Sequence, residues 1–574
     1  MGFRMLLTTK FTKKPLLSRT RVVIITTRGN TNDASQVGEK KESATKQTPK
    51  VDSSLQKYKI PDEDPDIPKK HVFQQLRRIR QQDAVFTLEE AAKFKAPDSF
   101  GKSWKYPTAF DQLGNMEYSF RSYENEHSVI TQFPDATDFL IVGSGLIGSA
   151  TAYYCKKMAS RCADIAVIDK DPYSPHNCTA LCNGLISSQS KSRDISRIAT
   201  LSKELIRTLR NDVLVEEDDF AQIKYRPVTH LILWPEVEID DVMTAVDSQI
   251  KDGCYTRAKL PEELELTWPW LNVIDSDVHL GTHGDQDEAI VDPIGLRNLY
   301  RTLAQAHGAN FIQAEALDFN MQYNINTPQM HPFSAGAVLA RVTSGQIKSV
   351  MVAKTLLCLG HNTPFLEARA EMEDEIRDSI QDLHFLQPKL RLCFIFNSMA
   401  APIINFPVIT DTDGSVLLRD DYAGTFKYYL TLDECDKFFE EDNEVFMSMD
   451  SDNPFPNLFH KGKKFEDYFV NTIKPRLVKR IPVMEDAKFL LTNSGFESVN
   501  TYDACPIVSL HPFHQKIVLS GGYGKRLMSF APLAAASLSE LLILDEEETF
   551  DVTNFYWDRV IKGRKVDEFH SLVA

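Results

Sequence analysis

The stretch that most constrains this chain runs from Asp138 to Ala150 and combines an apolar run, a glycine turn and helix-compatible sequence. Phe139 to Val142 is short and apolar, as expected of an inner strand of a parallel sheet covered on both faces. Gly143, Gly145 and Gly148 then fit the pattern G-x-G-x-x-G. Such glycines permit a tight turn, close approach of the backbone to a pyrophosphate, and close packing of helix on strand. The stretch therefore predicts a dinucleotide-binding unit.

The sequence that follows supports this interpretation, because the glycine pattern alone is weak. Helix-compatible residues run from Leu146 to Met158, and a second apolar run, Ile165 to Ile168, ends at Asp169. An acidic residue about twenty positions after the third glycine is where such folds hold the ribose hydroxyls. The same carboxylate would repel the 2′-phosphate of NADP. A glycine turn in some other α/β protein is the alternative.

Length, charge and cysteine usage bound the remaining possibilities. At 574 residues the chain is too long for one compact core, which predicts two domains. The formal net charge of -15 argues against a nucleic-acid partner, because phosphate binding needs a basic face. No apolar run approaches the ~20 residues that span a bilayer, so we predict no transmembrane helix. The nine cysteines include no C-x-x-C pair, and Cys178 and Cys182 lack a histidine-rich partner pattern, which predicts reduced thiols and no metal site.

Three segments precede the glycine turn. Residues 1–32 carry seven Lys or Arg residues, frequent Ser and Thr and no acidic residue, which is typical of a mitochondrial transit peptide, with a disordered basic tail as the alternative. Residues 33–68 are polar and predict a disordered linker. Residues 69–134 mix helical spacing, basic residues and aromatic irregular sequence. They predict an arm that packs on the main body, a membrane surface or a partner.

Later segments indicate that the chain leaves the first domain and returns to it. Composition shifts at the strand-like run Val228 to Trp234, and Gln346 to Leu359 alternates like paired strands. Near the end, Ile517 to Leu519 predicts a strand, Ser520 to Gly524 is glycine-rich, and Pro532 to Leu544 predicts an apolar helix. This second strand–glycine–helix unit suggests a return to the cofactor domain.

Four further pieces of sequence connect the chain to a known family. They are Trp268-Pro269-Trp270-Leu271-Asn272; Asp287-Glu288 with Asp292-Pro293; Pro407-Val408 with Asp413-Gly414 and Arg419; and Asn500-Thr501 with Asp503, followed by His511-Pro512. With the glycine pattern, they resemble the D-amino-acid oxidase and sarcosine oxidase group of FAD-dependent oxidoreductases. Within that group the chain resembles a mitochondrial branch tied to the assembly of respiratory complex I. The resemblance runs from about residue 138 to near the C-terminus.

The resemblance implies an α/β architecture in which a Rossmann-like FAD domain is interleaved with a mixed-sheet α+β substrate domain that roofs the isoalloxazine. It implies FAD-binding parts at 135–226, 281–320, 346–385 and 486–550, substrate-domain parts at 227–280, 321–345 and 386–485, and a C-terminal extension at 551–574.

The resemblance also implies which residues lie against the cofactor. The ADP half would contact Gly143, Ser144, Gly145, Leu146, Ile147, Gly148, Asp169 and Lys170. Residues near the flavin and pyrophosphate would be Thr179, Asn183, Gly184 and Gly360, with Gly522 at the far side of the flavin.

Two departures from the family pattern bear on the chemistry. Relatives with covalent flavin carry a cysteine where this chain has Phe496, and Cys505 comes several residues later, so we predict non-covalent FAD. The last glycine segment of the family usually reads G-[FY]-S-G-H-G, whereas here Lys525 is followed by Arg526 and Leu527. Backbone beside a flavin ring often must be glycine to fit, so Leu527 indicates an altered substrate side.

Two functions follow from the resemblance. In the first, FAD stabilises the fold, and the protein holds complex I subunits or assembly intermediates in the mitochondrial matrix, with peripheral contact to the inner membrane left open. In the second, the flavin oxidises a small amine or N-substituted amino acid. Arg419 or Arg526 would then clamp a carboxylate, and a proton would be managed by His283, Tyr523 or Lys525. A structural or surface role is the alternative for each side chain, and the altered glycine segment favours the first function.

Overall fold

Residues 133–572 are described by a computed structural model, apart from gaps at 160–162, 173, 175–176, 213–214, 216, 275, 285–287, 324–332, 343–345, 364–384, 402–405, 421–423, 441–462, 513, 515 and 570–571. All of them belong to one unit of the chain, 97–574. The expected transit peptide, linker and all but the last two residues of the arm lie outside the described residues. These three segments stay predictions.

A seven-stranded mixed sheet contains the strand that leads into the glycine turn. Its strands are β1 (Ala136–Val142), β2 (Ile165–Asp169), β9 (Asn310–Tyr323), β10 (Phe333–Val342), β11 (Ile347–Leu357), β17 (Ile507–Leu510) and β18 (Ile517–Gly521). β1 lies between β2 and β11 and is parallel to both, while β2 pairs in parallel with β9 and β11 with β18. The carboxyl ends of these strands therefore meet at one edge of the sheet, where open α/β sheets bind ligands.

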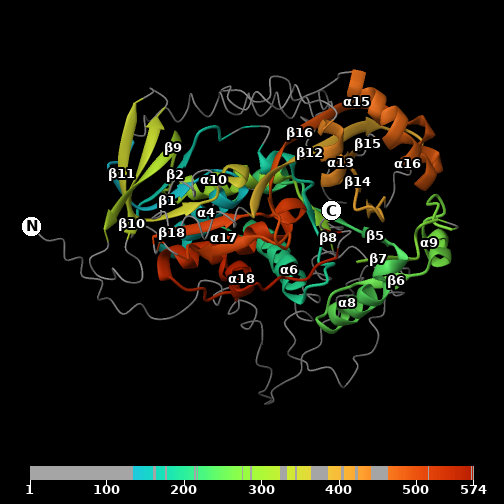
Figure 1. Cartoon of the computed structure of the whole chain (residues 1–574), viewed down its shortest axis with the longest axis horizontal. Coiled ribbons are helices and arrows are strands. Elements are labelled where there is room, and N and C mark those ends of the chain that lie inside the picture. The colour runs from blue at the N-terminus through green and yellow to red at the C-terminus, as the bar shows by residue number, and fades with distance from the viewer. Residues whose placement is uncertain are drawn as a thin grey trace, which may run out of the picture. The chain divides into compact units, whose positions relative to one another are not determined.

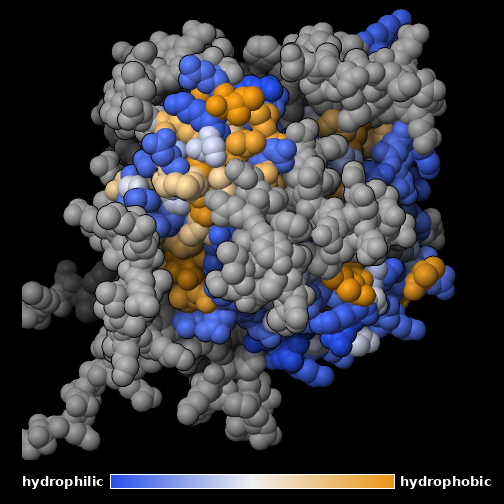
Figure 2. Space-filling view, turned by 60° about the vertical axis from the view of Figure 1, so that its left-hand side comes forward, coloured by the Kyte–Doolittle hydropathy of each residue, from blue (hydrophilic) through white to orange (hydrophobic). Residues whose placement is uncertain are grey.

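Three of these strands continue past the parallel core as an antiparallel meander. The outer part of β9 pairs with β10, and β10 pairs with the first half of β11, at the left of Figure 1. In that half of β11, Ile347 and Met351 are 61% and 59% exposed. Figure 2 shows hydrophobic surface interspersed with hydrophilic surface on the side of the molecule turned forward there. The meander therefore leaves apolar side chains on the surface.

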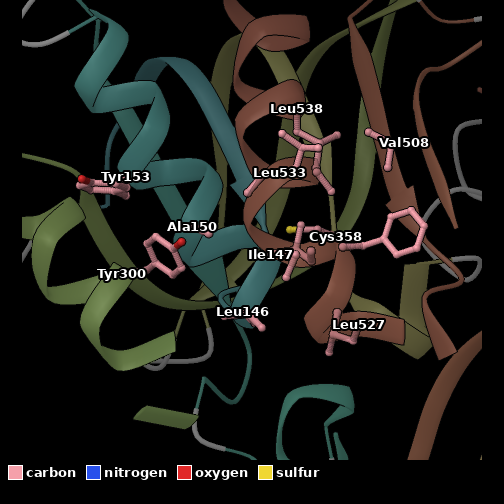
Figure 3. Packing of buried hydrophobic residues seen from close by; sticks show 14 of the residues in the cluster. Leu146, Ile147, Ala150, Tyr153, Tyr300, Cys358, Val508, Leu527, Leu533 and Leu538 are labelled. Carbon is pink, nitrogen blue, oxygen red and sulfur yellow. The ribbon is translucent and has the colours of Figure 1, made fainter. Parts of the chain in front are cut away.

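Helices cover the parallel core and form the largest apolar cluster. α4 (Leu146–Ala159) packs against α10 (Pro293–Ala306) and α17 (Leu527–Leu544), and α17 also packs against α6 (Arg193–Thr208). In Figure 3, Tyr153 of α4 faces Tyr300 of α10, with ring centroids 5.6 Å apart. Ile147 and Leu533 lie on the α17 side. Asp292 caps α10 by accepting from the Ile294 amide at 3.0 Å, as expected of an N-terminal Asp-Pro pair.

The second large sheet has eight strands. In spatial order its strands are β16 (Lys488–Asn500), β12 (Leu386–Asn397), β15 (Thr425–Tyr429), β14 (Val416–Arg419), β13 (Val408–Thr410), β5 (His230–Trp234), β7 (Leu280–His283) and β6 (Arg257–Lys259). Its helices are α8 (Ile239–Lys251), α9 (Pro261–Thr267), α13 (Leu432–Glu440), α15 (Lys463–Tyr468) and α16 (Lys474–Arg480). Stacked phenylalanines such as Phe396 and Phe426, 5.6 Å apart, lie in the core of this region.

Short elements complete the described fold. A three-stranded sheet consists of β3 (Leu185–Ile186), β8 (Glu288–Ile290) and β4 (Arg226–Val228), and the remaining α-helices are α5 (Cys178–Leu181), α7 (Glu217–Gln222) and α18 (Asp558–Ile561). β3 and β4 both pair with β8, so residues from three distant parts of the sequence meet there. The α/β fold with mixed sheets agrees with the expected class.

Several boundaries differ from the sequence expectation. The run from 346 to 359 forms one strand, β11, instead of a pair, because its partners come from β1, β10 and β18. Segment 321–345, expected in the substrate domain, supplies β10 to the first sheet. Conversely, β7 and β16, which lie in segments expected to bind FAD, belong to the eight-stranded sheet. Strand pairing across the chain decides these assignments, and local composition does not report it.

The last long helix contains a longer apolar stretch than we expected from the sequence. The stretch Gly524–Leu544 is long and apolar enough to cross a membrane by length and composition, although we expected no run of that size. However, 89% of its apolar window is buried inside the fold, against α4 and α6. α17 also begins at Leu527 rather than at Pro532, which lies inside the helix. Its apolar character is therefore that of a core helix.

Candidate functional site

The three glycines of the turn have separate physical roles. Gly143 has φ +109°, and a Cβ built there would lie 2.4 Å from the carbonyl oxygen of Cys358. A Cβ on Gly148 would lie 1.9 Å from the carbonyl oxygen of Gly143. A Cβ on Gly145 would meet only the hydroxyl of Thr179, at 3.4 Å. The protein itself thus requires the first and third glycines, whereas the second borders open space.

The acidic residue at the end of β2 is tied to the same turn. One carboxylate oxygen of Asp169 accepts from the amide of Ser144 at 2.6 Å and from its hydroxyl at 2.9 Å. The other accepts from the amide of Asp171 at 3.0 Å. The predicted acid therefore lies directly beside the first βα turn. The neighbouring Lys170 pairs with Glu315 at 3.0 Å and is largely exposed.

The amino end of α4 keeps donors that could hold an anion. The Leu146 amide is taken by the hydroxyl of Thr179 at 3.0 Å. Within the part of the chain that the structure describes, the amides of Gly145, Ile147 and Gly148 have no hydrogen-bond partner. Free N–H groups at the positive end of a helix dipole are suited to a phosphate. With the space beside Gly145, this turn fits the pyrophosphate of a dinucleotide.

A cavity of about 620 Å³ opens at this turn, at the carboxyl ends of the parallel strands. Its volume falls in the range of about 300–1,000 Å³ that small-molecule and cofactor sites occupy. Of the sequence-predicted residues, its wall includes Gly143, Gly145, Leu146, Ile147, Asp169, Lys170, Thr179, Gly360 and Tyr523. The structure thus brings the turn, the acid and two later glycine segments to one cavity.

The other end of the cavity contains residues that sequence reasoning did not assign. His361 lies 5.6 Å from the ring of Phe496, and burial lowers its pKa to about 4, so its imidazole is neutral. Glu497 forms a buried ion pair with Arg391 of β12. The thiol of Cys178 lies 3.6 Å from the Phe496 carbonyl oxygen, and burial raises its pKa to about 11. Phe496 and Glu497 lie on β16, which pairs with β12, and the elements that carry Cys178 and His361 pack against β16.

Several predicted residues support the cavity without lining it. Ser144 is held by Asp169, and Gly148 is packed under the turn. Gly184, at φ +75°, would place a Cβ 2.3 Å from the carbonyl oxygen of Val291. Gly522, at φ +76°, would place one 2.9 Å from the Cβ of Asn500. The positive φ and these close contacts explain why the two positions are glycine.

A second cavity, of about 40 Å³, lies next to the segment that follows Gly522. It is lined by Asn183, Leu185, Ser187, Gln189, His230, Thr410, Gly414, Val416, Lys525, Arg526, Ser529 and Leu572. Asn183, expected near the flavin, thus lines this smaller cavity, and its side chain accepts from the Leu185 amide at 3.0 Å. Eight of these twelve residues have polar side chains.

Burial lowers the pKa of two titratable side chains of the second cavity. Lys525 donates to the Gly414 carbonyl at 2.9 Å, and burial, with a smaller contribution from Arg391, lowers its pKa to about 7. The ring of His230 contacts the hydroxyls of Ser187 at 2.9 Å and Thr410 at 2.8 Å. Burial lowers the pKa of His230 to about 3.

The weak catalytic candidates lie in different surroundings. Tyr523 lines the large cavity, and its hydroxyl is 2.7 Å from that of Ser520. Arg419 and His283 are buried and line neither cavity, and His283 packs edge-on against Trp268 at 5.5 Å. These two residues are therefore not brought to the cavities where we expected them.

Arg526 was expected to clamp a substrate carboxylate, with a structural or surface role as the alternative. Its guanidinium instead pairs with Glu568 at 2.6 Å, and their side chains are 11% and 2% exposed. Among the described residues there is no group of three or more His, Cys, Asp or Glu side chains that could hold a metal ion.

The glycine turn, the acid beside it and the large cavity define a dinucleotide-binding α/β protein, and comparison with known proteins gives its family. Residues 138–541 match the model of the FAD dependent oxidoreductase (DAO) family, and the chain belongs to this family. The fold is similar to that of L-proline dehydrogenase from P. horikoshii, with TM-score 0.57 and 16% identity, covering 76% of this chain and 100% of that one. For glycine oxidase from Geobacillus kaustophilus, the TM-score is 0.54 at 16% identity, covering 74% and 98%.

Two relatives among curated proteins match most of this chain at low sequence identity. The chain is 23% identical to FAD-dependent oxidoreductase domain-containing protein 1 of Mus musculus, over 76% of this chain and 88% of that protein. It is 22% identical to the Drosophila melanogaster homolog of that protein, over 79% of this chain and 84% of the homolog.

Proposed function

We propose that the chain binds one FAD without a covalent bond in the 620 Å³ cavity. The observation that carries this proposal is the open space at Gly145 beside free amides and the Asp169 carboxylate. The diphosphate would lie against the amides of Gly145, Ile147 and Gly148. The ribose would lie against Asp169. Bound FAD supplies hydride-accepting chemistry, while the protein binds and orients it.

Two features favour non-covalent attachment. Phe496, at the position where relatives with covalent flavin carry cysteine, has no nucleophilic atom and lines the cavity. Cys178 lies beside it, but its raised pKa keeps the sulfur protonated near neutral pH, and the thiolate is the reactive form. The test is an absorbance spectrum of purified protein before and after acid precipitation. We expect all flavin to appear in the supernatant. Flavin that stays with the precipitated protein would contradict the proposal.

We further propose that the biological role is in the mitochondrial matrix, where the protein holds complex I subunits or assembly intermediates. The acid-free basic start of the sequence supports the location, and the resemblance to the complex I branch supports the role. The pairing of Arg526 with Glu568 also favours this role over turnover, because that guanidinium is already neutralised beside the small cavity.

The assembly role is tested by deletion and rescue. Cells that lack the protein should lose assembled complex I, measured on native gels, and the wild-type chain should restore it. Rescue by Gly145→Val would show that FAD is dispensable for assembly, whereas failure of a stably folded Gly145→Val would link assembly to the cofactor. Unchanged complex I after deletion would overturn the assembly role.

Oxidation of a small amine or amino acid is the second candidate function. The observation that favours it is Lys525, a buried amine whose pKa of about 7 lets it accept or donate a proton near neutral pH. Anaerobic incubation with candidate amines tests it, since bleaching of the flavin absorbance reports electron transfer. An absence of bleaching across amines and N-methylated amino acids would count against this function.

A further inference from the structure

The segment that follows α18, from Lys562 to Phe569, crosses the outside of the fold with little regular structure. Lys562 to Lys565 are exposed. The segment is anchored at its start by Arg559, whose guanidinium donates to Asp503 at 2.7 and 3.0 Å. The Val566 amide donates to the same carboxylate at 3.2 Å. We call residues 562–569 the strap.

At the end of the strap, one carboxylate occupies a complete anion site. An oxygen of Glu568 accepts from the Ser190 hydroxyl at 2.6 Å and pairs with the Arg526 guanidinium at 2.6 Å. Its other oxygen accepts from the Lys191 amide at 2.8 Å. The Glu568 side chain is only 2% exposed. A guanidinium, a hydroxyl and an amide that converge on two oxygens form a general receptor for a carboxylate.

Two described residues after Glu568 pack against the fold. Phe569 is buried and packs on Trp234, with ring centroids 4.7 Å apart. Leu572 lines the second cavity together with Arg526. Arg526 therefore belongs both to the cavity wall and to the carboxylate site. Release of Glu568 would leave the positive charge of Arg526 available at the cavity.

We propose that the strap is a displaceable plug in which Glu568 acts as an internal carboxylate ligand of Arg526. A small monocarboxylate would compete with Glu568 for the site formed by Arg526, Ser190 and Lys191. The strap would then detach, and the monocarboxylate would pair with Arg526 at the wall of the second cavity. This inference goes beyond the proposed function, because it concerns a closure that operates whether or not the flavin is reduced.

The experiment measures hydrogen–deuterium exchange of the strap in the full-length protein, with sodium acetate as the probe and sodium chloride at equal ionic strength as the reference. We expect acetate to increase the exchange rate of the strap amides several-fold. We expect Glu568→Gln to raise the rate without acetate and to bind acetate about tenfold more tightly by calorimetry, because the competing charge-assisted bond is weakened.

Asp567→Asn is the matched control. Asp567 is the preceding residue, is 74% exposed and pairs with the Lys191 side chain at 2.9 Å, so its change removes one strap carboxylate outside the site. Its exchange and acetate binding should equal those of the wild type. The proposal is overturned if acetate leaves strap exchange unchanged, or if Asp567→Asn loosens the strap as much as Glu568→Gln. Flavin content, read from absorbance in each sample, separates these outcomes from a failure of FAD binding.

Discussion

The carboxylate of Asp169 accepts hydrogen bonds from both the amide and the hydroxyl of Ser144, at 2.6 and 2.9 Å. This pair joins the end of β2 to the turn after β1, two places that are 25 residues apart in sequence. It holds the acid at the rim of the large cavity, beside the amino end of α4. Ring-shaped polar ligands such as a ribose can therefore meet a carboxylate that the protein has already oriented.

The glycines of the turn should respond differently to substitution. Gly145→Val should fold but lose flavin, because the new side chain enters the cavity and meets only Thr179. Gly148→Ala should lower the free energy of unfolding by about 3 kcal/mol or more, because its Cβ overlaps backbone. Flavin absorbance relative to protein and thermal unfolding measure the two effects. A Gly145→Val protein with full flavin content would argue against the site.

Asp169→Asn should weaken FAD binding about tenfold or more, because hydrogen bonds to a charged group are worth about 1.5–3 kcal/mol. The shape is kept, while the charge is removed and one acceptor oxygen is replaced by an NH2 group. Lys170→Ala is the control, since this neighbour is 64% exposed and its ion pair contributes about 1 kcal/mol at most. Fluorescence titration of the flavin-free protein with FAD measures both dissociation constants. An equal loss of FAD affinity in the two variants would show that the Asp169 carboxylate makes no specific contact with FAD.

Lys525 should make stability rise with pH. Its pKa falls from 10.5 to about 7 on folding, so between these values the unfolded chain binds more protons than the folded one. The free energy of unfolding therefore increases from pH 7 to about 10.5, and this contribution is absent in Lys525→Met. Urea unfolding of both proteins across that range measures the difference between the slopes. Parallel slopes would mean that Lys525 keeps its ordinary pKa.

Glu288 should make stability fall as pH rises, opposite to the effect of Lys525. Burial raises its pKa from 4.5 to about 7, while Gln189 donates to its carboxylate at 2.9 Å. Between pH 4.5 and 7 the folded chain binds more protons, so stability falls as pH rises. Glu288→Gln keeps the shape and should remove this fall, as read from unfolding midpoints at several pH values. A fall of the same size in the variant would assign it to other groups.

Local sequence was sufficient for the elements with short-range signals. The strand, turn and helix around Gly145 and the strand ending at Asp169 formed as expected, because hydrophobic period and glycine spacing act over a few residues. Local sequence did not predict every residue that lines the two cavities. Asn183 lines the smaller cavity instead, and Glu497 reaches the large one on β16, whose pairing with β12 joins segments about 100 residues apart.

The sequence by itself determined the nucleotide-binding turn and the family, because both reside in contiguous patterns of glycine, acid and apolar residues. Only the tertiary structure decided which residue pairs with Arg526. Its partner Glu568 lies 42 residues further along the chain, and the two meet because the strap folds back onto Arg526, Ser190 and Lys191. Contacts between distant segments depend on how sheets and helices pack, and no local spacing carries that information.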